Sequence, residues 1–361
     1  MALADPPPLH AAAPTIEVDG QSYPLLATNL EQMCMRESLG GLSSLELSFV
    51  DSVSRGNGSQ FAASGDSPLR LGAGVRVFAG AASVGAVEIF DGQVTAIESE
   101  VRQDGPPLFT LVAEDRLFAA RRRRRTHLFE AMALGDVVCE VASDFGLTPE
   151  VRDGVDPTAR DWMQTDETDL AFLRRILGRF DCDMQVVGDR IQVGRVGMDQ
   201  RSLVTLEVGD TLLSARITAD VAEQVASIRL ASFDPATGEA ADGEEDSNGF
   251  GPGEGRSGPE ILRERLATVA LHCGRSGPLT DGDAATLARL EGERRARAFV
   301  QVDGCARGNG NLRVGSWVKL QGVNPLFANQ FAVHEATHRW DREDGYRTNF
   351  LAESAYLKEA T

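Results

Sequence analysis

The sequence of 361 residues lacks several patterns that would assign it to a common class of protein. Its cysteines are odd in number and show no C-x-x-C spacing; they are Cys34, Cys139, Cys182, Cys273 and Cys305. A zinc knuckle needs closely spaced cysteine pairs, and a disulfide framework needs an even number of cysteines. The sequence therefore predicts neither of them, and we expect reduced thiols, most of them buried.

Long apolar runs are also missing. No stretch approaches the roughly 20 apolar residues that a transmembrane helix requires. The Ala- and Pro-rich residues 1–14 lack the basic start and the apolar centre of a signal peptide. We therefore expect synthesis in the cytoplasm, no stable membrane insertion, and later export only through a machine or through lysis.

Basic residues are in the minority: 36 Lys and Arg stand against 54 Asp and Glu, which gives a formal net charge of −18. Binding to nucleic acid requires a basic face that neutralises phosphates, so we expect no nucleic-acid specificity. One basic cluster, residues 121–125, consists of five arginines. Such a run is usually a solvated face or the lining of an interface, and we expect one of these roles here.

The sequence is rich in short stretches where apolar and polar residues alternate, as in Leu45, Leu47 and Phe49. This period of two is typical of half-buried antiparallel strands. It extends over residues 15–118, and we predict a first tube-like β-barrel domain at residues 1–118. The pattern returns after residue 200, where we predict a second such domain at residues 201–361.

Between these parts, residues 119–200 show the spacing of a small α/β domain. Its clearest helix is predicted by the apolar stripe formed by Leu170, Leu173, Ile176, Leu177 and Phe180. A hairpin is predicted over residues 184–193. Within the second β-rich domain, the acidic and Gly-rich residues 234–259 are expected to form a poorly ordered loop, followed by helices at 261–273 and 284–298. The overall expectation is a β-rich α+β fold.

The two β-rich parts contain a similar series of residues, which indicates an internal repeat. The first series is Leu69-Arg70-Leu71-Gly72 with Val75, then Phe90, Gln93-Val94, Asp104-Gly105 and Leu111-Val112-Ala113-Glu114-Asp115. The second is Leu312-Arg313-Val314-Gly315 with Val318, then Phe327, Gln330-Phe331, Asp344-Gly345 and Phe350-Leu351-Ala352-Glu353-Ser354. The order is the same and only the loop lengths differ. We therefore predict two equivalent units per chain, so that a ring of three chains would present six.

Segments from most of the chain, taken in order, resemble the phage late control protein D group. This group includes hub proteins of contractile phage tails and is related to the N-terminal part of VgrG from type VI secretion. The matching segments are residues 90–98, 113–117, 164–176, 312–320 and 345–350, together with His338.

This resemblance implies a homotrimeric, non-enzymatic baseplate hub with two tube-like barrels per chain. It would join the hexameric ring of an inner tube protein to a trimeric spike, as a symmetry adaptor among the other baseplate components. The sequence ends at Thr361 without spike-like repeats, so the spike is expected to be a separate protein. Whether the machine is a phage tail, an extracellular injection system or an intracellular one stays open.

A competing interpretation comes from His334, Glu335 and His338, which form a literal H-E-x-x-H sequence. On a helix this pattern places two histidines on one face to bind zinc, with the glutamate as general base of a peptidase. The segment, however, alternates and ends in a hairpin turn, so it predicts a strand. On a strand the two histidines would lie about 13 Å apart, too far to share one zinc. We therefore expect no catalytic, cofactor-binding or metal-binding residues.

A third interpretation is a soluble carbohydrate-binding β-sandwich. Such a protein would present an aromatic platform to its ligand. With three Trp and three Tyr in 361 residues, the sequence offers little material for one. This possibility stays open beside the hub and the peptidase.

Overall fold

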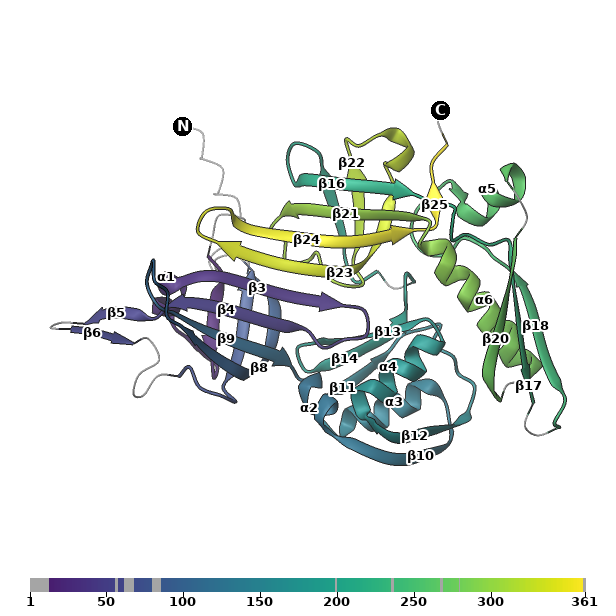
Figure 1. Ribbon diagram of the computed structural model, residues 1–361, viewed down its shortest axis with the longest axis horizontal. Coiled ribbons are helices and arrows are strands. Elements are labelled where there is room, and N and C mark those ends of the chain that lie inside the picture. The colour runs from purple at the N-terminus through teal and green to yellow at the C-terminus, as the bar shows by residue number, and fades with distance from the viewer. Residues whose placement is uncertain are drawn as a thin grey trace.

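The computed structural model of the protein describes residues 13–55, 58–61, 68–79, 86–198, 200–234, 237–266, 269–278 and 280–359. Two antiparallel β-sheet halves lie next to each other, and α/β units cover one side of the pair (Figure 1). The β-rich α+β fold with two related barrel-like halves is therefore as predicted. Among the described residues, no helix is both long and apolar enough to cross a membrane.

One sheet of 13 strands contains both halves, in the order β2-β1-β7-β8-β9-β4-β3-β23-β24-β21-β16, with β22 attached to β23 and β15 to β22. The bounds of its first-half strands are β1 Thr15–Val18, β2 Gln21–Ser22, β3 Leu30–Ser38, β4 Ser44–Val50, β7 Gly74–Ala79, β8 Val87–Glu100 and β9 Leu108–Asp115. Those of the second half are β15 Leu203–Glu207, β16 Leu212–Ala219, β21 Val300–Arg307, β22 Trp317–Gln321, β23 Gln330–Asp341 and β24 Gly345–Ser354.

Short elements complete the two halves. They are helix α1 Pro24–Asn29, the hairpin of β5 Ser52–Arg55 and β6 Gly58–Phe61, the 3-10 helix η3 Pro325–Phe327, and the pair of β19 Arg256–Ser257 and β25 Tyr356–Leu357. Each half has its own apolar core. Trp340 and Tyr346, from β23 and β24, belong to the core of the first half, because these two long strands extend across it.

Two α/β units share a third core. The first contains the two-stranded sheet β10-β12 and the three-stranded sheet β11-β14-β13, with helices α2, α3 and α4. Its bounds are α2 Leu117–Arg122, β10 Arg124–Met132, α3 Leu134–Ser143, β11 Thr148–Val151, β12 Arg160–Thr168, α4 Asp169–Arg179, β13 Cys182–Val187 and β14 Arg190–Arg195. The predicted apolar stripe lies on α4, and the predicted hairpin is formed by β13 and β14.

The second α/β unit lies inside the second half; its helix α6 was predicted, but its three-stranded sheet was not. It has the sheet β18-β17-β20 and helix α6, which lie together at one end of the molecule (Figure 1). The bounds are β17 Ser227–Phe233, β18 Ala240–Asp246, α5 Gly258–Arg265, β20 Ala270–Pro278 and α6 Asp281–Arg297.

The prediction of a loop at residues 234–259 is therefore wrong for β18, and also for β19 and the start of α5. The inward positions of β18 are Ala241 and Gly243, and a Cβ on Gly243 would lie 2.3 Å from the backbone nitrogen of Ala285 in α6. Small residues thus let the helix approach the strand closely, which an average of hydrophobicity does not reveal. The helix predicted at 261–273 is also wrong beyond Arg265, because Leu271 and Cys273 pack in β20 against the shared core. The other predicted helix is α6, which begins three residues earlier than expected.

The internal repeat is confirmed by matching hydrogen bonds. Gly72 and Gly315 both have φ +79°. The amide of Gly72 donates to the carbonyl of Val94 at 2.8 Å, and that of Gly315 donates to Val333 at 3.0 Å. The strand pairing then skips one residue after Val94 and one after Val333. Val94 therefore corresponds to Val333, and the predicted match of Gln93-Val94 to Gln330-Phe331 is wrong by two residues.

The repeat also includes strands whose correspondence could not be seen in the sequence. Ala113 pairs with Leu45 and Ala352 pairs with Val302, so β4 corresponds to β21. Leu45 in turn pairs with Met35 and Val302 with Ile217, so β3 corresponds to β16. A bulge lies at the same place in both copies, between Leu30 and Gln32 and between Leu212 and Ser214. The copies differ at their first strand: β1 is antiparallel to β7, whereas β15 is parallel to β22.

Candidate functional site: the junction between the two halves

The two halves meet where β23 changes its neighbour. Residues 330–332 of β23 pair with β22, and residues 335–341 pair with β3, on the same edge of the strand. The change occurs at the bulge after Val333, where His334 has no partner in the pairing with β24. We call the pairing of β3 with residues 335–341 the internal junction; the two strands lie side by side in Figure 1.

A buried ion pair closes the internal junction. Glu37 on β3 is 4% exposed and contacts Arg313 of the loop before β22, with the closest N–O distance 2.6 Å. The amide of Val314 also donates to Glu37, at 2.7 Å. Burial alone would raise the pKa of Glu37, but the charge and hydrogen bonds of Arg313 outweigh it, so the net pKa is lowered. Glu37 is thus held as a carboxylate that fixes one half to the other.

His338 lies on β23 in the same junction, opposite Met35 of β3. Its side chain is fully buried, and its Nδ1 is 2.6 Å from the hydroxyl of Tyr346. Burial lowers the pKa of His338 to about 4, so the ring is neutral at pH 7. The histidine therefore serves the packing of the junction as a neutral hydrogen-bonding group.

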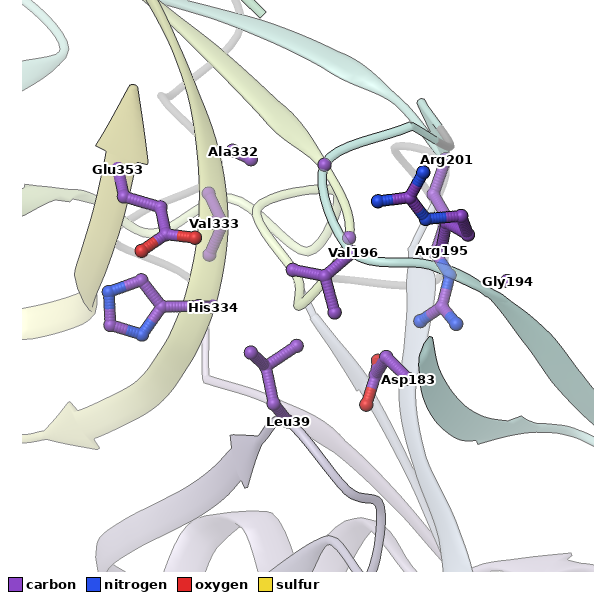
Figure 2. Close-up of a pocket in the computed structure, with 12 residues that line it drawn as sticks. Leu39, Asp183, Gly194, Arg195, Val196, Arg201, Ala332, Val333, His334 and Glu353 are labelled. Carbon is purple, nitrogen blue, oxygen red and sulfur yellow. The ribbon is translucent and has the colours of Figure 1, made fainter. Parts of the chain in front are cut away.

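The geometry of the H-E-x-x-H segment is that of a strand, as the sequence predicted. Glu335 is exposed while His338 is buried, so these two side chains do not share a site. His334 instead lines a small pocket opposite Asp183 and Arg195 (Figure 2). In the described part of the chain, no group of three or more His, Cys, Asp or Glu side chains is placed to hold a metal ion.

Purified protein is expected to contain no stoichiometric zinc and to show no peptidase activity, because a strand does not bring His334 and His338 to one metal. Elemental analysis of the wild type and of His334→Ala should give the same metal content. One zinc per chain that is lost in His334→Ala would contradict this expectation.

The pocket in Figure 2 marks the corner where the internal junction meets the first α/β unit. Arg195 and Glu353, which line this pocket, belong to a buried network centred on Arg297 of α6, which is 2% exposed. Arg297 donates two hydrogen bonds of 2.7 Å to Asp181 and one of 3.0 Å to Glu353 of β24. Arg195 of β14 joins the same network through Asp181, at 3.3 Å, and Glu293, at 2.6 Å. These charges connect both α/β units to the sheet.

The arginines of residues 121–125 are largely paired with acids of the same chain. Arg121 pairs with Glu114 at 2.7 Å and Arg124 with Asp166 at 2.7 Å. Arg123 and Arg125 both pair with Asp169, whose side chain is buried. The cluster therefore has much less free charge than its sequence indicated, because its acidic partners lie elsewhere in the chain.

Two of the strand edges without a partner among the described residues belong to the large sheet and lie on long strands. One is the outer edge of β16, the last strand of the large sheet, beyond Leu212, which forms an isolated bridge with Val208. The other belongs to residues 95–100 of β8: β9 covers one edge of this segment, but β7 on the other side ends its pairing at Gln93. Both segments are largely exposed. Since β16 corresponds to β3 and β8 to β23, these edges are the counterparts of the two strands that form the internal junction.

The chain was compared with known families and curated proteins. A family model described as the Alg8 N-terminal domain matches residues 10–341, and it is not a model of the late control protein D group. No curated protein sequence matches the chain.

Solved structures of similar fold include tail proteins. The 43 kDa tail protein of prophage MuSo2 from Shewanella oneidensis has a TM-score of 0.67 and 12% identity, over 94% of this chain and 97% of that one. A tail protein from Neisseria meningitidis has a TM-score of 0.67 and 10% identity, over 95% and 99%. An Escherichia coli component of the type VI secretion system has a TM-score of 0.55 and 13% identity, over 92% and 76%. The chain thus has the fold of these tail proteins.

Proposed function

Because the chain belongs to the family of the Alg8 N-terminal domain and has a tail-protein fold, we propose that it is a non-enzymatic baseplate hub. The hub would belong to a contractile phage tail or a related contractile injection system. In this role three copies form a ring that joins a hexameric inner tube to a trimeric, separate spike.

The duplication of the sheet carries this proposal. Both halves share the same order of paired strands, the same glycine turns at Gly72 and Gly315, and bulges at the same places. A ring of three such chains presents six nearly equivalent units while keeping true three-fold symmetry. Closed cyclic symmetry is the usual arrangement for identical subunits joined head to tail. One face can then match six tube subunits and the other a three-fold spike.

The alternatives receive less support. A zinc peptidase would need His334, Glu335 and His338 around one metal. In this structure His334 lies at a bulge, Glu335 is exposed and His338 is buried in the core. A carbohydrate-binding sandwich would need an aromatic platform; two of the three tryptophans, Trp162 and Trp340, are buried.

Image reconstruction of the assembled particle tests the proposal. We expect three copies of this chain between tube and spike, with the two halves of each copy at alternating positions of one ring. Six copies, or a place outside the central channel, would contradict the symmetry-adaptor role.

A further inference from the structure

The internal junction predicts how two copies of the chain meet. In the junction, Met35 of β3 lies opposite His338 and Ser38 lies opposite Glu335. The repeat gives a counterpart to every strand involved: Ile217 of β16 corresponds to Met35, and Ala96 of β8 corresponds to Glu335. Both counterpart edges lack a partner among the residues that the structure describes. An unpaired edge is a template for pairing with another chain.

We propose that β16 of one copy pairs antiparallel with residues 96–100 of β8 in the next copy, in the register of the internal junction. This inference rests on the proposed hub function and specifies its self-association surface. We call this pairing the interchain contact. It places Ser99 opposite Ile217, Glu98 opposite Thr218 and Glu100 opposite Arg216.

The side chains fit this register. Glu100 and Arg216 have opposite charges, and an opposite-charge pair directly across two strands is favourable. The edges also expose apolar side chains that a partner would cover: Ile97 is 36% exposed, Val101 87% and Leu213 45%. Three contacts of this kind would make the large sheets of three chains continuous around a ring, so that no edge of this type stays open.

The interchain contact lacks the ion pair that closes the internal junction. In the interchain contact, Ala219 of β16 stands where the internal junction has Glu37, and Arg70 stands where the internal junction has Arg313. The Arg70 side chain is 62% exposed and contacts Asp19 at 2.9 Å. Such an exposed pair contributes little. The internal junction therefore holds the two halves of one chain together at all times. The interchain contact, in contrast, is weak between isolated chains and is stabilised in the particle by the tube and the spike.

Cysteine cross-linking of the full-length chain tests the register. In Ser99→Cys/Ile217→Cys the two sulfurs come from directly opposite residues, whose Cα atoms lie about 4.5–5.5 Å apart in an antiparallel pair, within disulfide range. The matched control is Ser99→Cys/Thr218→Cys, in which the second side chain points to the other face of the sheet. Single-cysteine variants report the background from the five native thiols. Oxidation at high protein concentration traps even a weak contact.

We expect covalent dimers and trimers from the in-register pair, and only background from the control. Equal cross-linking in both, or none in the in-register pair, would overturn the proposal. The result is separable from the hub function. Three copies in a ring without in-register cross-linking would refute this contact alone, whereas cross-linking in a protein that lies outside the central channel would refute the hub and leave the contact standing.

A gain-of-function variant tests why the contact is weak. Ala219→Glu introduces the carboxylate that the internal junction has at Glu37, facing Arg70 of the next copy. A charge-assisted hydrogen bond of this type corresponds to roughly tenfold tighter association. Sedimentation-equilibrium ultracentrifugation measures this change in the association constant. The control Ala215→Glu adds the same charge on the same strand away from Arg70. Equal association in both variants would show that the missing ion pair does not limit the contact.

Discussion

Replacing Glu37 by alanine is expected to lower the free energy of unfolding by about 3–5 kcal/mol, the usual cost of removing one partner of a buried ion pair. The substitution leaves the Arg313 guanidinium, 20% exposed, without its carboxylate, and it also removes the acceptor for the amide of Val314. The internal junction should be the part that loosens. Urea unfolding followed by circular dichroism measures the total loss, and hydrogen exchange in β3 and β23 locates it.

Two controls separate the ion pair from general damage to the sheet. Glu46→Ala removes an exposed partner of Arg36, at 3.9 Å, and should cost less than about 1 kcal/mol. The double variant Glu37→Leu/Arg313→Met removes both charges and should recover much of the stability, because an apolar pair has no buried charge to leave uncompensated. If Glu37→Ala costs no more than Glu46→Ala, the ion pair does not hold the halves together.

The same ion pair has a defined pH dependence. The pKa of Glu37 is lowered in the folded protein relative to its usual 4.5. Its stabilisation is therefore fully present above pH 4.5 and is lost as the pH falls through the lower, folded-state pKa. The stability difference between wild type and Glu37→Gln should shrink over that acidic range.

The sequence was most informative where local chemistry fixes the backbone. Gly72 and Gly315 adopt a positive φ that other residues rarely tolerate, so a glycine appears at the same place in both copies of the repeat. The apolar stripe of α4 and the alternation of β4 likewise reflect one buried face each. These features could be predicted because they depend only on neighbours in the chain.

The register of the repeat and the strand β18 could not be predicted in this way. The bulges at Thr95 and His334 are set by pairing with β9 and β24, and neither residue type identifies a bulge. In β18 the buried positions are Ala and Gly, so close approach of α6 replaces the burial of large side chains.

The ion pairs were missed because they join distant parts of the chain. Glu37 and Arg313 are 276 residues apart, and Asp181 and Arg297 are 116 apart. In the sequence each of these residues is one charged residue among many. The only available signal was indirect: a charged residue at an inward position of a predicted strand, as Glu37 is in β3.

Replacing Arg297 by alanine should be as severe as the loss of Glu37, about 3–5 kcal/mol, because it removes the centre of the second buried network. Glu353 would lose its 3.0 Å contact with this arginine, Asp181 would keep its contact with Arg195, and a cavity would form where a side chain of 2% exposure had been. Burial alone would lower the pKa of Arg297, but Asp181 and Glu353 raise it, so its positive charge is secure.

A neighbouring residue on α6 provides the control for this last prediction. Arg294 is 57% exposed and pairs with Glu291, which also has Arg295 at 3.0 Å, so Arg294→Ala should cost less than about 1 kcal/mol. Arg297→Lys should lie between the two, because lysine keeps the charge but cannot form the two parallel hydrogen bonds to Asp181. Chemical denaturation of the three variants gives the order directly. If Arg297→Ala and Arg294→Ala unfold at the same urea concentration, the network does not connect the α/β units to the sheet, and the shared apolar core alone must do so.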